Sequence, residues 1–263
     1  MKSVLITGAY GGMGKAAVNK LINLGYTIFA LDKKVQDLEP NVYPIEADIT
    51  KIEDIEKAFI KVKSITDELN AIIHFAGIYA LDSLVEISEE EFIKSFNVNV
   101  FGAFRVNKVF APLLKERSKI IITTSELAPL DPLPFTGLYA ITISALDKYA
   151  FSLRMELQLI GVFVRVLRCG AVDTGMISTS TAALDKFCQK TKLYSVNAKR
   201  FKKIVDKVES RKVSPEKVAK RVCKIINRKN PPFTSNLNRN PLLLLLNLLP
   251  QKLQTKIIKL ILK

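Results

Sequence analysis

The chain of 263 residues contains a single histidine and only three cysteines. With one histidine, at position 74, a catalytic triad or a zinc site built on histidine is nearly excluded. The cysteines, Cys169, Cys188 and Cys223, are odd in number, widely spaced and without the spacing of metal ligands. We therefore expect no bound metal and a reducing, cytoplasmic compartment.

Long apolar runs are absent as well. No run approaches the roughly 20 residues that a membrane-spanning helix needs. The first residues lead straight into an apolar strand, so we expect no signal peptide. A chain of this length folds as one large domain or two small ones, with enough residues for a full core.

Glycine, in contrast, gathers near the start of the chain. An apolar strand over 4–6 leads into the glycine turn, TGAYGGMG at 7–14, and an amphipathic helix follows. Gly8, Gly12 and Gly14 form a G-x-x-x-G-x-G variant of the dinucleotide-binding fingerprint. Such a turn lets the backbone approach a phosphate, and the helix N-terminus favours negative charge. Glycine-rich turns also serve close packing, so the turn alone leaves that alternative open.

Two carboxylates follow later strands. The strand expected over 27–31 ends at Asp32, 18 residues after Gly14, close to the place about 20 residues on where a carboxylate binds the adenosine ribose. Asp48 and Ile49 end a third short strand, where a carboxylate would face the adenine. The alternative for Asp48 is an N-cap of the next helix, and the residue can serve in both ways.

Asp32 also bears on the choice of cofactor. A carboxylate accepts hydrogen bonds from a ribose 2′-hydroxyl and repels a 2′-phosphate, so we favour NAD(H) over NADP(H). Lys33 and Lys34 follow at once. They are either ordinary solvated charges or a site for a 2′-phosphate, which keeps NADP(H) as the alternative.

Short apolar strands and long helices alternate through the middle of the chain. Strands are expected over 71–75, 119–123 and 162–167, and helices over 89–110 and 138–157. This alternation predicts an α/β fold, a Rossmann-like, doubly wound parallel sheet covered on both faces. Ligands of such a sheet bind beyond the carboxyl ends of its strands. The residues brought to that edge are the glycine turn, Asp32, Asp48, Gly77 and Ser125.

Further motifs then occur in a fixed order. They are HFAG at 74–77, Asn99 with Gly102 three residues on, Ser125 with Tyr139 14 residues on, and CGAVDT at 169–174. Together with the glycine turn, these motifs resemble the short-chain dehydrogenase/reductase family over about residues 1–175. The matching family elements are Asn-Asn-Ala-Gly, a helix Asn followed by Gly, a Ser at a strand end, a Tyr, and Pro-Gly-x-x-x-Thr.

The resemblance implies an NAD(P)-dependent oxidoreductase that moves a hydride between the nicotinamide and a carbonyl or alcohol carbon. Ser125 would polarise the substrate oxygen, and Tyr139 would give or take the proton as general acid/base. Asn99 would hold a water in a proton relay. The cofactor-binding residues taken from the motifs and the resemblance are Thr7, Gly8, Tyr10, Gly12, Met13, Gly14, Asp32, Asp48, Ile49, Ala76, Gly77, Gly170, Val172 and Thr174.

Each implied catalytic residue also has an ordinary structural role that stays open. Ser125 would cap the following turn, Tyr139 would be a packed aromatic, and Asn99 would bind the backbone locally. The resemblance further implies a homodimer or homotetramer, because family members pair through the long helices near 90–110 and 138–157.

One position departs from the family pattern in a way that affects the chemistry. The family tyrosine is followed four residues later by lysine, whereas Ile143 stands four residues after Tyr139. That lysine would bind the nicotinamide ribose and lower the tyrosine pKa, which is about 10 in a free side chain. Lys148, nine residues on, points to the opposite helix face. His74, Phe75 and Cys169 also replace the family's two asparagines and its proline.

Three interpretations follow from this departure. The protein is an oxidoreductase with an altered relay, or another cation such as Arg105 or a C-terminal group fills the gap. Alternatively it is a pseudoenzyme that binds NAD(H) and acts as a sensor or partner at a membrane surface. We favour the active oxidoreductase, acting on an apolar alcohol or ketone that is steroid-, retinoid- or lipid-like.

The C-terminal quarter carries the whole excess charge. Residues 1–198 contain 22 Lys and Arg and 22 Asp and Glu, whereas 199–263 contain 18 and 3. We divide the chain into a dinucleotide-binding domain over 1–230, with a substrate lid over about 176–213, and a Leu- and Lys-rich amphipathic helical extension over 231–263.

The extension has the pattern of helices that lie in a membrane interface. A leucine run over 241–249 ends at Pro250, and a second helix begins after it. Its lysines, at 252, 256, 259 and 263, fall within about 60° on a helical wheel, and apolar residues fill the rest. We favour association of 199–263 with an anionic membrane, on its inner face. The alternatives are packing on the body or a partner subunit and solvated lysines; we discount nucleic acid because aromatics are few and no known binding module occurs.

Overall fold

The computed structural model describes residues 2–36 and 40–263. Within them, seven strands form one sheet in the order β3-β2-β1-β4-β5-β6-β7, and every neighbouring pair is parallel. The strands are β1 (Ser3–Thr7), β2 (Thr27–Asp32), β3 (Val42–Glu46), β4 (Leu69–His74), β5 (Leu114–Ser125), β6 (Phe163–Cys169) and β7 (Thr234–Leu237). The predicted doubly wound α/β fold is confirmed.

The chain begins in the middle of the sheet. It starts at β1, runs outward to β3 and returns to β4, so the strand order reverses between β1 and β4. In an open α/β sheet, ligands bind beyond the carboxyl ends of the strands at such a reversal. The first glycine turn leaves the sheet at this point.

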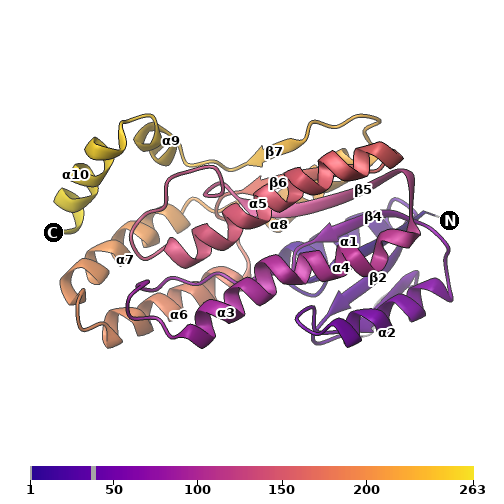
Figure 1. The fold of residues 1–263 in the computed structure, drawn as a ribbon, viewed down its shortest axis with the longest axis horizontal. Helices are drawn as coiled ribbons and strands as arrows, with labels where there is room; N and C mark the ends of the chain where they lie inside the picture. The colour runs from indigo at the N-terminus through magenta and orange to yellow at the C-terminus, as the bar shows by residue number, and fades with distance from the viewer. Residues whose placement is uncertain (1, 37–39) are drawn as a thin grey trace.

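Helices cover both faces of the sheet (Figure 1). They are α1 (Gly12–Ile22), α2 (Ile52–Lys63), α3 (Glu89–Phe96), α4 (Gly102–Phe110), α5 (Gly137–Leu157), α6 (Gly175–Lys190), α7 (Ser195–Glu209), α8 (Pro215–Asn227), α9 (Pro241–Asn247) and α10 (Gln251–Leu262). One apolar core joins α2, α4 and α5 to one face of the sheet, and a second joins α1 and α8 to the other. The strands between these cores are buried on both sides, which explains their continuous apolar sequences.

Two elements differ from the sequence expectation. The helix expected over 89–110 is divided into α3, a π-helical segment at Asn97–Phe101 and α4. Strand β7 was not expected, because its sequence TSNL is short and has no apolar run; its pairing with β6 defines it. Residues 234–237, within the segment assigned to the extension, therefore complete the sheet.

The remaining helices gather at the carboxyl end of the strands, on the left in Figure 1. A third apolar cluster joins Leu184 and Phe187 of α6, Phe201 of α7 and Leu262 of α10. The segment over 176–213, predicted as a lid, thus consists largely of two helices, and α10 packs against α7. Within the residues that the structure describes, no helix is both long and apolar enough to cross a membrane.

Candidate active site

The glycine turn between β1 and α1 is closely packed at three positions. Gly8 has φ of 67°, and a Cβ atom there would lie 2.6 Å from the backbone nitrogen of Ala76. A Cβ on Gly12 would lie 2.7 Å from Cγ2 of Thr174, and one on Gly14 would overlap the carbonyl oxygen of Gly8. Among the residues that the structure describes, no side chain caps the first turn of α1. The turn therefore presents backbone and an uncapped helix N-terminus, a combination that suits a phosphate.

Two more of the predicted residues are buried and pack on neighbouring backbone. Thr7 is buried at the end of β1, where its hydroxyl oxygen accepts a hydrogen bond of 3.5 Å from the backbone nitrogen of Ala76. Ile49 is buried against α4, and a Cβ on Gly102 would lie 2.5 Å from its Cδ1 atom. Thr7 therefore ties the end of β1 to the backbone of Ala76, and Ile49 packs on α4.

Asp32 stands at the end of β2 beside the glycine turn. Its Oδ2 atom accepts a hydrogen bond of 3.0 Å from the backbone nitrogen of Tyr10, and its Oδ1 atom accepts one of 2.8 Å from that of Lys33. The carboxylate thus fixes the turn and remains partly exposed at the carboxyl edge of the sheet.

Asp48 follows β3 on the same edge. Its Oδ1 atom accepts hydrogen bonds from the backbone nitrogen and the hydroxyl of Thr50, and its Oδ2 atom pairs with Lys33 Nζ at 2.9 Å. Burial raises the pKa of Asp48, but the hydrogen bonds from Thr50 and Lys33 outweigh it and leave the pKa below its usual value. The N-cap of α2 is Lys51, so Asp48 caps the preceding turn instead of the helix.

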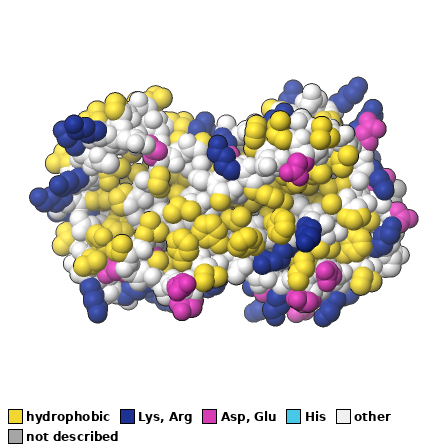
Figure 2. Space-filling model, in the orientation of Figure 1, with side chains coloured by type: hydrophobic (Ala, Val, Ile, Leu, Met, Phe, Trp, Pro, Cys, Tyr) yellow, Lys and Arg dark blue, Asp and Glu magenta, His cyan; other side chains and the backbone are white. Residues whose placement is uncertain are grey.

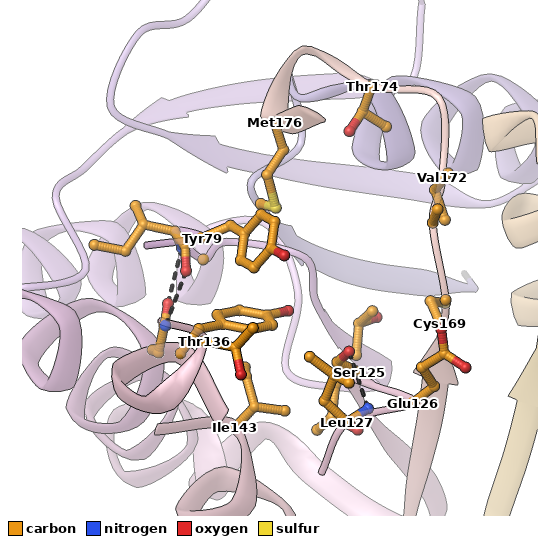
Figure 3. A pocket seen from close by; sticks show the side chains of 18 of the residues that line it. Tyr79, Ser125, Glu126, Leu127, Thr136, Ile143, Cys169, Val172, Thr174 and Met176 are labelled. Atoms are coloured by element: carbon orange, nitrogen blue, oxygen red, sulfur yellow. Dashed lines mark hydrogen bonds between the residues drawn. The ribbon is translucent and has the colours of Figure 1, made fainter. Parts of the chain in front are cut away.

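A cavity lies where the glycine turn, β5, α5 and the segment after β6 meet (Figure 3). Of the predicted residues, it is lined by Met13, Ala76, Gly77, Asn99, Ser125, Tyr139, Gly170, Val172 and Thr174. The other predicted residues, Thr7, Gly8, Tyr10, Gly12, Gly14, Asp32, Asp48 and Ile49, lie at the turn and at the ends of β2 and β3. Figure 3 shows Tyr79 and Ile143 on one side of the cavity and Val172 and Thr174 on the other.

Tyr139, Ser125 and Ile143 form what we call the tyrosine corner of this cavity. Tyr139 lies in the first turn of α5, and its ring meets that of Tyr79 edge-on with centroids 4.5 Å apart. Burial raises the pKa of Tyr139 to about 12; a hydrogen bond with Ser125 lowers it in part, and Cys169 adds to the rise. Ser125 Oγ also accepts a hydrogen bond of 3.2 Å from the backbone nitrogen of Leu127 and so caps the next turn.

Asn99 lies in the π-helical segment and is buried. Its Oδ1 atom accepts a hydrogen bond of 2.8 Å from the backbone nitrogen of Ile78, and its Nδ2 atom donates to the carbonyl of Ile78 and the hydroxyl of Thr142. Both side-chain atoms therefore bind protein groups distant in the sequence. Asn99 ties the loop after β4 to α5, next to Tyr139.

The cavity contains no cationic side chain among the residues that the structure describes. Ile143 is buried in the core and lines the cavity four residues after Tyr139. Arg105 does not line it; its guanidinium donates to the carbonyl and the side chain of Asn97. Lys148 is exposed to solvent. The described side chains therefore provide no positive charge that would lower the Tyr139 pKa.

His74 is buried below the cavity at the end of β4. Its Nε2 atom lies 2.8 Å from Oδ1 of Asn107. Burial lowers the pKa of His74 to about 4, although the contact with Asn107 raises it in part. The side chain is therefore neutral near pH 7, and it does not line the cavity.

Sequence reasoning missed much of the cavity lining, including Tyr79, Glu126 and Leu243. Glu126 is buried one residue after Ser125, and burial raises its pKa although the backbone of Asn240 and the charge of Arg239 lower it. Leu243 comes from α9, far along the chain. The position of Glu126 next to Ser125 is the signal that would have found it; Leu243 has no signal beyond the leucine run.

Comparison with known proteins identifies the family. The profile of the family described as short chain dehydrogenase matches residues 2–185. The chain belongs to the short-chain dehydrogenase family. This family assignment agrees with the parallel sheet and with the cavity at its carboxyl edge.

Individual members of the short-chain dehydrogenase family are also similar to the chain. The 3-ketodihydrosphingosine reductase of Bacteroides thetaiotaomicron is 27% identical over 231 residues, which cover 88% of this chain and 85% of that protein. Estradiol 17-beta-dehydrogenase 2 of the mouse is 34% identical over 187 residues, or 66% of this chain; the match spans only 49% of the mouse protein.

A solved structure extends the likeness beyond the matched profile. The alcohol dehydrogenase from the archaeon Thermococcus sibiricus, complexed with 5-hydroxy-NADP, has a TM-score of 0.72 and 25% identity. The likeness covers 90% of this chain and 96% of that one. The fold that this chain shares with the archaeal enzyme therefore continues past residue 185, where the family profile ends.

Proposed function

We propose that the protein is an NAD(H)-dependent oxidoreductase that moves a hydride between the nicotinamide and an apolar alcohol or ketone. One observation carries the proposal. A single cavity at the carboxyl edge of the sheet is lined by Ser125, Tyr139 and Thr174, which come from three separate elements, and it adjoins the glycine turn.

The residues present fit a nicotinamide dinucleotide. The glycines keep side chains away from the backbone at the uncapped N-terminus of α1, where the diphosphate would lie. Asp32 would meet the adenosine ribose, and Val172 and Thr174 line the cavity where the nicotinamide would enter. When bound, the cofactor supplies or accepts the hydride.

A preference for NAD(H) has support from two charges. The carboxylate of Asp32 would repel a 2′-phosphate. Lys33, which would attract one, is paired with Asp48 at 2.9 Å. Lys34 remains as a cation next to the site, so we expect a preference and not an absolute selection.

The tyrosine corner determines which direction of proton transfer is easier. Ser125 would hydrogen-bond the substrate oxygen, and Tyr139 would exchange the proton with it. Because burial raises the Tyr139 pKa to about 12, its hydroxyl keeps its proton at neutral pH. The side chain is therefore in the protonated form that can donate to a developing alkoxide, and the phenolate that the reverse reaction needs is scarce at neutral pH. We propose ketone reduction as the faster direction.

The far end of the cavity supports an apolar substrate. Its walls there are the side chains of Phe201, Ile204, Val205, Val208 and Leu243. Two relatives are named for a long-chain ketone and a steroid, 3-ketodihydrosphingosine and estradiol. We therefore propose a steroid-, retinoid- or lipid-like ketone for this chain.

A pseudoenzyme is the second candidate, and the missing cation favours it. In that case the cavity would bind NAD(H), but Tyr139 would contribute nothing to turnover. The same protein preparation can separate the two proposals. Calorimetry with NADH and NADPH comes first, followed by cofactor oxidation with a panel of apolar ketones.

An active reductase binds NADH more tightly than NADPH and loses turnover in Tyr139→Phe. A pseudoenzyme binds NADH without turnover that depends on Tyr139. Absence of binding by either cofactor would overturn both proposals, because each relies on the glycine turn and Asp32.

We also propose that the protein forms a homodimer or homotetramer through α4 and α5. Hydrophobic side chains extend across the middle of the face that these helices form (Figure 2). Phe101, Phe104, Phe151 and Met155 are each more than two-fifths exposed there. Sedimentation of the purified protein tests this, and Phe104→Glu together with Phe151→Glu should give a monomer.

A further inference from the structure

Helices α9 and α10 are anchored to the body on one side, their inner face. Asn240, the N-cap of α9, donates its backbone N–H to Glu126 Oε2. Asn247 Oδ1 accepts a hydrogen bond of 2.6 Å from the backbone nitrogen of Asp131, and Gln254 Nε2 donates to Asp131 Oδ2 at 3.1 Å. These bonds hold both helices in one orientation over the loop after β5.

The end of α10 is anchored as well. Asn197 of α7 donates a hydrogen bond of 2.7 Å to the carbonyl of Leu262, and the Leu262 side chain is buried with Ile258 in the third apolar cluster. Part of the apolar surface of the extension therefore packs on the body. The rest of the apolar surface of α9 and α10 is exposed to solvent.

The remainder, which we call the outer face, is apolar along both helices. Leu242, Leu245 and Leu248 are 66%, 61% and 81% exposed on α9, and Leu260 is 83% exposed on α10. Leu253 is also exposed. Single exposed leucines are ordinary on a protein surface. A row of them on two anchored helices indicates a surface that binds a protein or a membrane.

Charge of one sign accompanies these leucines. Lys252, Lys256, Lys259 and Lys263 are all exposed on α10, and on a helical wheel their stripe lies next to Leu253 and Leu260. The sequence contains no Asp or Glu after Glu216. Figure 2 shows Lys and Arg side chains beside hydrophobic ones at the end of the molecule that carries α9 and α10, on the left.

We propose that the outer face of α9 and α10 docks on an anionic lipid bilayer. The exposed leucines would enter the boundary between headgroups and acyl chains, and the lysines would contact lipid phosphates. Charge complementarity selects this occupant, because the face has no carboxylate with which a basic or neutral protein surface would pair. The helices lie on the membrane and do not cross it, in agreement with their length and composition.

Docking would also place the cavity at the membrane. Leu243 lines the cavity, while Leu242 and Leu245 of the same helix face solvent. A docked α9 would therefore separate the cavity from the bilayer by one helix. This consequence for substrate access relies on the proposed function, whereas the docking itself does not.

The test is flotation of the full-length protein with two kinds of vesicle, phosphatidylcholine alone and phosphatidylcholine with phosphatidylserine. We expect binding to the anionic vesicles, weakened by salt, and little to the neutral ones. Lys256→Gln with Lys259→Gln should weaken binding about thirtyfold, since each lysine near an anionic surface contributes about 1 kcal/mol and 1.4 kcal/mol is tenfold. Leu242→Ser with Leu245→Ser should weaken it by at least as much.

A matched control comes from α2, where Ile60 is 67% exposed between exposed lysines. Lys57→Gln, Ile60→Ser and Lys61→Gln together should leave vesicle binding unchanged. Circular dichroism of each variant checks that the fold is kept, and the exposed lysine variants keep the test valid if a leucine variant is unstable.

The proposal is overturned if the protein does not float with anionic vesicles at low salt, or if the α2 control weakens binding as much as the outer-face variants. It is also overturned if the leucine variants change only the oligomeric state in sedimentation, because the occupant is then a second copy of the chain. Neither outcome depends on NADH turnover, so failure of docking and failure of the proposed function remain distinguishable.

Discussion

The glycine turn and the tyrosine corner lie at the same edge of the sheet but depend on different physics. At the turn, backbone shape is decisive: a Cβ on Gly8 would lie 2.6 Å from the Ala76 nitrogen. At the corner, electrostatics is decisive, because desolvation of the Tyr139 hydroxyl raises its pKa to about 12. Cofactor binding and proton transfer are therefore sensitive to different substitutions.

This difference explains how the two functions can separate. Ile143 belongs to the main apolar core, so an aliphatic side chain there packs with its apolar neighbours. A cation at the same place would favour the Tyr139 phenolate at a cost in desolvation. The corner can lose its charge while the fold and the glycine turn remain intact, whereas the turn cannot change without disturbing its neighbours.

The largest expected effect follows from a substitution in the glycine turn. Gly8→Val would force a β-branched residue to φ of 67° and against the Ala76 backbone. We expect complete loss of NADH binding in calorimetry and a loss of about 2 kcal/mol or more in the free energy of unfolding.

Gly25→Ala is the matched control for Gly8→Val. Gly25 also has positive φ, of 77°, but a Cβ there would meet nothing within 4 Å. Gly25→Ala should lower the free energy of unfolding only by the backbone strain, about 1 kcal/mol, and should leave the NADH affinity unchanged. Retained NADH binding in Gly8→Val would show that the close approach at the turn has no part in holding the cofactor.

The second effect concerns the tyrosine corner and has a definite sign with pH. Alcohol oxidation needs the Tyr139 phenolate, so its rate should rise with pH without a plateau up to the limit of protein stability. Ile143→Lys adds a cation and lowers the Tyr139 pKa. Oxidation should become about ten- to a hundredfold faster near pH 8 and reach a plateau at lower pH, within the range of general acid/base effects.

Ile143→Met is the uncharged control for this variant. It preserves volume and should leave the pH profile as it was. Thermal unfolding of both variants measures what a buried lysine costs, on the order of several kcal/mol. If Ile143→Lys binds NADH and folds but has an unchanged pH profile, the pKa of Tyr139 does not limit the reaction.

The sequence predicted the architecture because its strands are mostly short continuous apolar runs and its helices have apolar residues at helical spacing. It also predicted the glycine turn, since Gly8 has a backbone conformation that other residues avoid. Strand β7 has no such run: its four residues are largely polar, and hydrogen bonds with β6 define it. A short edge strand of this kind can be recognised only once the rest of the sheet has formed, because pairing with β6 defines it.

The site was predictable in part for the same reason. Residues next to a strand end or in a spaced motif could be named, and the structure places many of them around one cavity. Leu243 and the contacts of Asn99 could not, because they depend on how distant elements pack. The alternative that Asp48 caps α2 was wrong, since the helix begins after Lys51.

The smallest expected effect is on the choice between cofactors, where the turn and its neighbouring charges act together. Asp32→Ser removes the carboxylate that would repel a 2′-phosphate, while Lys33 and Lys34 remain. The Kd ratio of NADPH to NADH should fall about tenfold, equal to about 1.4 kcal/mol. Both cofactors should bind somewhat more weakly, because Tyr10 loses the acceptor of its backbone N–H.

Glu46→Gln, at the exposed end of β3, is the control for the loss of one negative charge on this edge. It should leave the ratio unchanged. If both variants change the ratio equally, the preference arises from the general field of the edge. If only Asp32→Ser does, one carboxylate sets cofactor choice while one missing cation limits proton transfer, and the two parts of the site can then be altered independently.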